Sequence, residues 1–397
     1  MKTLFNSYIN AFKGLSTSVW WLSLITLINR AGTMVVPFMS LYLTEDLSFS
    51  FTEVGWIMSA FGAGSVIGSW LGGQLTDKIG YYKVMVFSLL LSGLLFIGLQ
   101  FLHTFTSLCF GVFLLMIVAD TFRPAMFVAL SAYSKPENRT RSLTLIRLAI
   151  NLGFSAGPAV GGFIILTMGY GGLFWLDGIT CFIAGILLIK VLSPKKANAS
   201  PSEMANNPQS AYKDGVFWIF VISMFLFGFI FLQYFSSVPL FYKDGFNLTE
   251  FEIGLLLGAN GFLIFILEMP LIKWLESKEY RKEFLIFLGA FLTMLSFLVM
   301  NLSGWIGVIF IGMVLMTIGE MVAFPFSNAF AMERAKKGNQ GQYMAFYSIG
   351  FSFSHIFGHN GGLQLIDKYG YFTTWNVMII IGLVNMLLLY FLMRKRS

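Results

Sequence analysis

The sequence predicts an all-α integral membrane protein with twelve transmembrane helices in two similar bundles of six, and three observations support this. Of its 397 residues, 57% are hydrophobic and 11% are charged, against about 25% charged in an average soluble protein. Twelve apolar runs follow one another, and a polar linker divides them six and six. A soluble domain could not bury this much apolar surface, so the composition excludes a soluble enzyme, a disordered chain and a nucleic-acid binder.

Each of the twelve runs is close to the roughly 20 apolar residues that a helix needs to cross the hydrocarbon core. Gly and Pro inside the runs are compatible with helices, because transmembrane helices tolerate both. The first run is longer than the hydrophobic part of a secretory signal, so we interpret it as the first span. The predicted spans are residues 18–43, 52–75, 82–102, 107–132, 143–167, 172–192, 216–241, 251–274, 284–303, 306–332, 342–366 and 372–393.

The basic residues are unevenly distributed around these spans. The net charge is +7, from 26 Lys and Arg and 19 Asp and Glu. Twenty-one of the 26 lie at the termini or in the loops of one side, whereas only Lys243 and Lys368 lie in loops of the other side. By the positive-inside rule both termini are cytoplasmic, which requires an even number of spans. We therefore expect a multi-pass protein of the plasma membrane, the inner membrane of the cell.

The longest polar stretch, residues 193–215, lies halfway along the chain. It is rich in Ser, Asn, Ala and Pro and has no apolar periodicity, which predicts a flexible cytoplasmic linker. The expected domains are an N-terminal six-helix bundle of residues 1–192 and a C-terminal six-helix bundle of residues 216–397.

The two halves are similar when the chain is shifted by about 200 positions. FTEVG at residues 51–55 then lies over FEIG at 251–254, and Asp120 lies over Glu320. Several matches in one register indicate an internal duplication. Two duplicated bundles predict a pseudo-two-fold axis along the membrane normal, an architecture typical of transporters that alternate between two open states.

The loop after the second span carries the first motif, GGQLTDKIGYYK at residues 72–83. It resembles the signature of the major facilitator superfamily between helices 2 and 3, although two tyrosines replace expected cations near its end. The resemblance implies a role in conformational change. The matched residues are Gly73, Asp77, Lys78 and Gly80.

The fifth span contains GFSAGPAVGG at residues 153–162. It is similar to a motif of the twelve-helix drug/proton antiporter branch of that superfamily. Small residues allow helices to pack closely, and a proline bends its helix, so close packing alone is the alternative explanation. The matched residues are Gly157, Pro158, Gly161 and Gly162.

The tenth span reads GEMVAFP at residues 319–325, which is similar to a segment of some multidrug antiporters. Together the three segments imply the major facilitator fold over essentially the whole chain. The chain departs from the family pattern at two places. An arginine common early in helix 4 would fall near Phe113, and the acids that some antiporters carry in helix 1 are replaced by Arg30.

Charged residues inside the predicted spans are the candidates for function, since each costs at least about 2.5–3.5 kcal/mol at mid-bilayer. Such a residue needs a partner, water or a role in transport. Four candidates lie near mid-depth and three lie toward the cytoplasmic side. They are Arg30, Asp120, Glu320 and His355 in the first group and Arg123, Arg147 and Glu268 in the second.

Asp120 and Glu320 are the strongest pair, because they occupy equivalent places in the two halves. A desolvated carboxylate can bind and release a proton, or pair with a cationic compound. Asp120 can instead form a structural ion pair with Arg123, three residues along the helix, or with Arg147. Glu320 has no cation close in sequence. Glu268 is a lesser candidate, for which the alternative is a helix-end carboxylate in contact with interfacial water.

Arg30 and His355 leave further alternatives open. Arg30 can face the transport pathway, pair with an acid or bind an anionic substrate. His355 and His359 lie four residues apart and so share a helix face. They suit a proton relay or a structural hydrogen-bonding role.

We therefore expect a secondary active transporter and not an enzyme. The sequence has no P-loop, no H-E-x-x-H, no nucleophile elbow and no Cys/His cluster, so we expect no cofactor and no metal. The favoured function is proton-coupled export of lipophilic or cationic compounds. The alternative is a proton-coupled uptake symporter for a sugar, peptide or organic anion, which Arg30 and Arg147 favour. The expected partners are a small-molecule substrate, protons and lipid, with no nucleic acid, and the expected state is a monomer.

Overall fold

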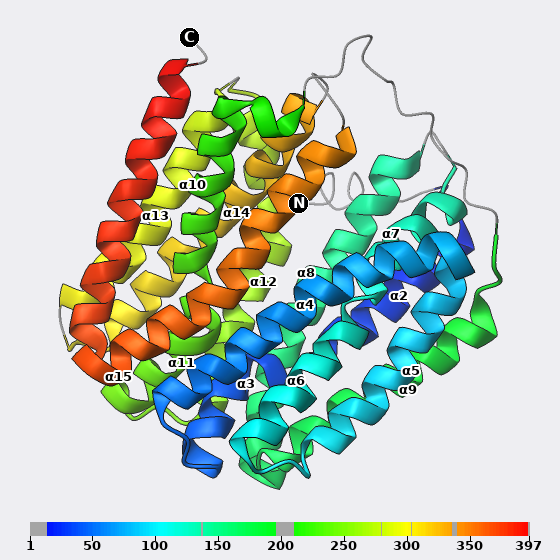
Figure 1. Cartoon of the computed structure of the whole chain (residues 1–397), viewed down its shortest axis with the longest axis horizontal. Helices are drawn as coiled ribbons and strands as arrows, with labels where there is room; N and C mark the ends of the chain where they lie inside the picture. Colours follow the sequence, from blue (N-terminus) through cyan, green and yellow to red (C-terminus); the bar gives the residue numbers. More distant parts are fainter. Residues whose placement is uncertain are drawn as a thin grey trace, which may run out of the picture. The chain divides into compact units, whose positions relative to one another are not determined.

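The computed structural model describes residues 14–135, 138–195, 210–278, 280–302, 304–335 and 340–395, and it is helical throughout these ranges except for short connections (Figure 1). In the first half the elements are α2 (Thr17–Ala31), α3 (Val35–Leu41), the π-helix η1 (Tyr42–Asp46), α4 (Phe51–Ile79), α5 (Tyr81–Leu99), α6 (Phe105–Ala119), α7 (Phe122–Tyr133), α8 (Arg139–Met168) and α9 (Gly171–Val191). In the second half they are η3 (Ala211–Lys213), α10 (Gly215–Phe231), α11 (Gln233–Phe246), α12 (Glu250–Glu276), α13 (Lys282–Leu302), α14 (Gly307–Ala335) and α15 (Gln340–Lys395).

Eleven helical stretches in the described ranges are long and apolar enough to cross a membrane. The last of them belongs to α15, whose 56 residues would extend about 84 Å if straight, far beyond one bilayer. Gly370 divides it, because its φ of 75° and ψ of 176° are not helical. The last two predicted spans lie on either side of this glycine, and the prediction of an all-α membrane fold is confirmed.

Three predicted spans are interrupted near their middle, which the apolar runs did not indicate. The first is broken between α2 and α3, the fourth between α6 and α7, and the seventh between α10 and α11. A break in a membrane helix leaves backbone N–H and C=O groups without their usual partners, and neighbouring side chains must satisfy them. A polar side chain lies at each break: Asp177 at the first, Asp120 at the second and Gln233 at the third.

The chain forms two compact units. The first unit comprises Met1–Val36 and Gly64–Ser200. In it α5 lies along α9, and α2 packs on α8 and α9 (Figure 1). Its apolar core lies where α2, α5, α7, α8 and α9 meet, and includes Leu22, Leu89 and Met126.

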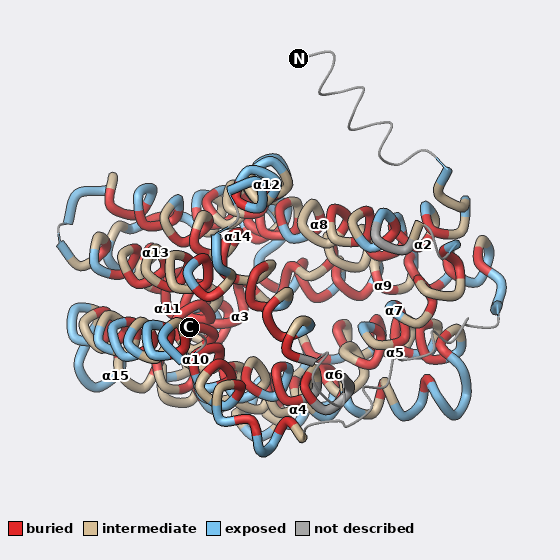
Figure 2. Tube along the Cα trace, turned by 90° about the horizontal axis from the view of Figure 1, so that it is seen from above, coloured by how far each residue is buried: buried red, intermediate tan, exposed pale blue. Residues whose placement is uncertain are grey.

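The second unit comprises Pro37–Ala63 and Pro201–Ser397. In it α10 packs along α15, and α14 packs on α12 and α13. Figure 2 shows long exposed stretches on α12 and α15, and many of these exposed residues are large and apolar. A helix that is apolar on its outer face suits contact with lipid.

Both ends of the predicted linker, residues 193–215, are hydrogen-bonded to helices. In the first unit the Tyr81 hydroxyl donates to the Lys195 carbonyl at 3.0 Å, and the Tyr133 hydroxyl donates to the Ser193 carbonyl at 2.8 Å. In the second unit Arg334 donates two hydrogen bonds to the Asp214 carboxylate, at 2.6 and 2.7 Å. Asp214 also caps the start of α10.

Candidate functional site

The surroundings of Asp120 begin with a stripe of glycines on α4. Gly64 and Gly68 face α6, and Gly72 faces Thr121 in the segment that joins α6 to α7. A Cβ atom on any of the three glycines would lie 2.4–2.6 Å from backbone atoms there. This contact brings Ser65 to the break in the fourth span, where its hydroxyl hydrogen-bonds to Asp120. The stripe as a whole is not among the predicted motifs, although its spacing of one glycine every fourth residue is a signal for close helix packing.

Arg30 is the cationic residue of the same region. It lies in the last turn of α2, its guanidinium lies 5.6 Å from the centre of the Phe154 ring, and its Nε is buried without a hydrogen-bond partner. Asp120 and Arg123 are both close enough to interact electrostatically with Arg30. The first unit thus brings together three predicted candidates, and Asp120 takes its hydrogen bond from Ser65 rather than from Arg123, whose side chain is exposed.

The glycines of the fifth span hold α2 close to α8. A Cβ atom on Gly153 would lie 2.5 Å from the Cβ of Arg30, and one on Gly157 would lie 3.1 Å from the Ala31 carbonyl oxygen. The approach at Gly153 requires a residue without a Cβ atom, and the approach at Gly157 leaves little room for one. Both contacts lie at the end of α2, where Arg30 lies. Other residues of this motif are also buried in α8, namely Pro158, Gly161 and Gly162.

The first motif lies on the last turns of α4 and at the start of α5, and residues 77–80 of it are exposed. Gly80 has a φ of 88°, a value that favours glycine. A Cβ atom on Gly73 would meet nothing within 4 Å, so close packing in this motif is made by Gly72 and not by Gly73. The side chains of Asp77 and Lys78 are exposed.

Glu320 lies on α14 in the second unit. Its polar neighbours on α12 are an amide and a second acid. Asn260 of α12 hydrogen-bonds to it and also donates to the Thr317 hydroxyl at 2.9 Å. Glu268, also on α12 and 7% exposed, is close enough to interact with it electrostatically. The Oε2 atom of Glu320 is buried without a hydrogen-bond partner, and no Lys or Arg of the described ranges forms an ion pair with it.

An aromatic group lies one helical turn from Glu320. Phe324 makes edge-to-face contacts with Phe227 and Phe231 of α10, with ring centres 5.4 and 5.0 Å apart, and it also contacts Phe351 of α15. Residues four apart share a helix face, so a carboxylate and a group of phenyl rings lie together in this unit. Aromatic rings bind cations through their faces and lipophilic groups through their area.

The two histidines form a separate group. The ring centres of His355 and His359 are 5.8 Å apart on α15, and both rings lie within 6.5 Å of the Phe61 ring of α4. His359 is only 2% exposed. The remaining predicted candidate, Arg147, is half-buried in α8.

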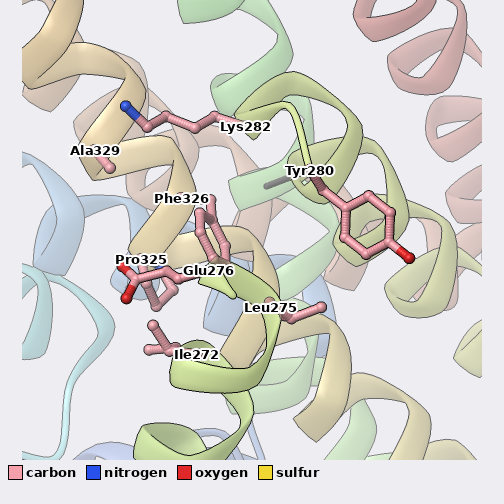
Figure 3. Close-up of a pocket in the computed structure, with 8 residues that line it drawn as sticks. All are labelled: Ile272, Leu275, Glu276, Tyr280, Lys282, Pro325, Phe326 and Ala329. Carbon is pink, nitrogen blue, oxygen red and sulfur yellow. The ribbon is translucent and has the colours of Figure 1, made fainter. Parts of the chain in front are cut away.

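A pocket of about 210 Å³ lies where α12 ends, near the start of α13 and the second half of α14 (Figure 3). Figure 3 shows the Glu276 carboxylate next to Pro325, and Lys282 extending toward Ala329. Lys282 also forms an ion pair with Glu333. None of the predicted candidates lines this pocket. It is therefore separate from the groups around Asp120 and Glu320.

One buried acid is not among the predicted candidates. Asp177 on α9 is fully buried and accepts hydrogen bonds from the backbone N–H groups of Met34 and Val35, at the break in the first span. Its sequence signal was an acid in an apolar run with no cation nearby, which does not reveal the partner because that partner is backbone.

The fold and the charged groups inside its spans are those of a polytopic membrane transporter. A comparison with known families identifies which family it is. The chain matches the Major Facilitator Superfamily over residues 22–359, and it belongs to that superfamily.

Similar proteins include a multidrug resistance protein, a cation/proton antiporter and a POT family transporter. The chain is 22% identical to the multidrug resistance protein MdtH of Photorhabdus laumondii, over 90% of this chain and 89% of that protein. It is also 22% identical to a Na⁺, Li⁺, K⁺/H⁺ antiporter of Planococcus maritimus, over 83% and 84% of the two chains. A crystal structure of a POT family transporter in complex with 5-aminolevulinic acid superposes with a TM-score of 0.81 at 16% identity, over 96% of both chains. This last likeness shows the fold alone.

Proposed function

We propose that this protein is a proton-coupled exporter of lipophilic or cationic compounds that works by alternating access. The observation that carries the proposal is Glu320, whose buried Oε2 atom has no hydrogen-bond partner and which has a second carboxylate, Glu268, nearby. An uncompensated buried carboxylate is costly. Binding of a proton or a cationic substrate removes that cost, and the two ligands then exclude one another.

The neighbouring aromatic group supports this substrate class. Phe324, Phe227 and Phe231 provide rings beside the carboxylate, which suits flat, lipophilic cations. The distant relatives named as a multidrug resistance protein and as a cation/proton antiporter support the same class. We also propose that the halves 1–192 and 216–397 alternate in the plasma membrane, with both termini in the cytoplasm and the protein as a monomer.

The second candidate function is proton-coupled uptake of a polar solute. It is favoured by Arg30, whose buried Nε has no partner, and by the second cation, Arg123, nearby. Two guanidinium groups suit a carboxylate or phosphate on the substrate. A POT family transporter with the same fold binds a polar solute, 5-aminolevulinic acid.

The test uses purified protein in liposomes with an imposed pH gradient. With an acidic lumen, a lipophilic cationic dye added outside should accumulate through molecules whose cytoplasmic side faces outward, and accumulation should stop when an ionophore collapses the gradient. Glu320→Gln should reduce accumulation to the level of empty liposomes. The matched control is Glu276→Gln, an exposed acid at the end of α12, which should transport as the unmodified protein does.

Two results would contradict the proposal. One is solute uptake only when the medium is acidic and the lumen neutral, which is the behaviour of a symporter. The other is unchanged proton-coupled transport by Glu320→Gln in protein that elutes as a single species.

A further inference from the structure

The first unit contains a buried acid that the proposed function does not use. Asp177 has 0% of its surface exposed. It lies in α9, whose other residues are mostly apolar. A buried carboxylate in a membrane helix is expensive unless it is fully satisfied. Its partners are therefore informative.

Both oxygens of the Asp177 carboxylate accept from the start of α3. The Met34 N–H lies 3.0 Å from Oδ1 and 3.0 Å from Oδ2, and the Val35 N–H lies 2.9 Å from Oδ2. The first N–H groups of a helix have no partner within it and carry partial positive charge. Asp177 thus closes the break in the first span with a side chain from the sixth span.

Two further residues of α9 hold the same segment. The Thr180 hydroxyl donates to the Asp177 carbonyl at 3.0 Å and fills the space beside Gly32, where a Cβ atom would lie 1.8 Å from it. The Cys181 sulfur lies 3.8 Å from Nδ2 of Asn29. Residues three and four apart share a helix face, so this face of α9 contacts the end of α2 continuously from Asn29 onward.

This contact determines where Arg30 lies. On the opposite side, Gly153 and Gly157 of α8 hold the backbone of residues 30–33, so the last turn of α2 is fixed between α8 and α9. The guanidinium of Arg30 then lies within electrostatic reach of Asp120. A shift at the break would move Arg30 but would leave Asp120, which is held by Ser65, in place.

We propose that Asp177 is a positioning residue for the charged group of the first unit: its carboxylate holds the break between α2 and α3 and so keeps Arg30 opposite Asp120. Asp177 acts through Arg30 and does not itself carry protons or substrate. The part of this inference that concerns transport rests on the proposed function. The part that concerns the contact does not.

The first arm of the test needs no substrate. Hydrogen exchange of the purified full-length protein is followed by mass spectrometry for the unmodified chain, Asp177→Asn and Asp177→Glu. The Asn side chain offers one acceptor in place of two, so peptides covering residues 29–41 should exchange at least several-fold faster, and Asp177→Glu should show a smaller change. The control Asp46→Asn, an exposed acid at the end of η1, should leave this peptide unchanged. Unchanged exchange in Asp177→Asn overturns the contact.

The second arm is a double-mutant cycle on transport in liposomes, with the rate measured across pH. Asp177→Asn should shift the pH profile in the same direction as Arg30→Gln. The double variant should be no worse than Arg30→Gln alone, a coupling of about ten-fold between the two sites. Independent, additive effects would show that Asp177 serves stability only, and overturn the positioning role.

The two proposals fail in different ways. If the unmodified protein drives no dye in the test above, the proposed export fails, while the exchange arm still decides the contact, and the cycle is run on solute uptake. If dye export is intact but the cycle is additive, the positioning role fails and the exporter stands.

Discussion

Asp120 and Glu320 occupy equivalent positions in the two halves of the sequence but have different surroundings. Asp120 lies at a helix break, accepts from a hydroxyl and is close enough to Arg30 to interact with it electrostatically. Glu320 lies inside the continuous helix α14, contacts an amide and has a second carboxylate nearby. The duplication thus preserved the position of an acid but not its charge environment. We infer that the first acid is compensated within its unit and that the second is left for a proton or a cation.

The breaks in the first and seventh spans also differ in charge. The break in the first span is closed by Asp177 from another helix. The break in the seventh span is closed by Gln233 from its own helix, whose Nε2 donates to the carbonyls of Phe229 and Gly358 at 2.9 and 2.7 Å. A neutral amide and a carboxylate solve the same backbone problem, so only the first half carries charge at its break.

The largest expected effect compares the two acids directly. Glu320→Gln should abolish proton-driven transport, whereas Asp120→Asn should leave a measurable fraction of it, because Ser65 can still hydrogen-bond to an amide. Dye accumulation at several imposed gradients measures both. An equal loss of dye accumulation in the two variants would contradict this difference and indicate that the two acids share one role.

The next largest effect is on stability, and it concerns the ion pair between Arg334 and Asp214, the residue before α10. Arg334→Gln leaves the buried Asp214 carboxylate without its cation, and removing one partner of a buried pair costs roughly 3–5 kcal/mol. Thermal unfolding of the purified protein measures the loss. Tyr81→Phe in the first unit removes only one neutral hydroxyl, for about 1 kcal/mol, so similar losses in the two variants would contradict the difference between the attachments.

The same pair predicts how stability depends on pH. Burial by itself would raise the pKa of Asp214, but hydrogen bonds from Arg334, the Phe217 N–H and Tyr343, with the charge of Arg334, outweigh it and hold the pKa below its ordinary value. A lowered carboxyl pKa contributes stability above the unfolded value, and this is lost as pH falls through the folded value. Unfolding temperatures between neutral pH and pH 3 should therefore fall more for the unmodified protein than for Asp214→Asn.

The glycine stripe of α4 predicts a smaller difference between neighbouring residues. A Cβ atom on Gly68 would lie 2.5 Å from the Ile117 carbonyl oxygen, whereas one on Gly73 meets open space. Gly68→Ala should destabilise by about 1–3 kcal/mol through overpacking. Gly73→Ala should be neutral or slightly stabilising, since Ala favours helices by up to about 1 kcal/mol. Equal unfolding temperatures would mean that α4 does not pack as tightly on α6 as the structure has it.

Much of the fold could be predicted because lipid imposes a simple rule on the sequence. Apolar runs of sufficient length must be helices, and charge distribution and composition need no knowledge of contacts. The breaks at Gly32, Asp120 and Leu232 could not be predicted in this way, because a broken helix keeps its apolar character. Their positions depend on which neighbour supplies a donor or acceptor, as Asp177 does.

The sequence by itself determined that this chain is a membrane protein of duplicated helical halves, that it carries the segments of its superfamily, and that a few charged residues lie inside its spans. Only the tertiary structure decided which of these charges meet. Arg30 lies near Asp120 at the end of α2, which the glycines of α8 and Asp177 contact. No Lys or Arg of the described ranges pairs with Glu320, and α12 brings Asn260 and Glu268 to it instead. Hydrophobic length is a property of one segment, whereas the partner of a buried charge depends on the packing of several.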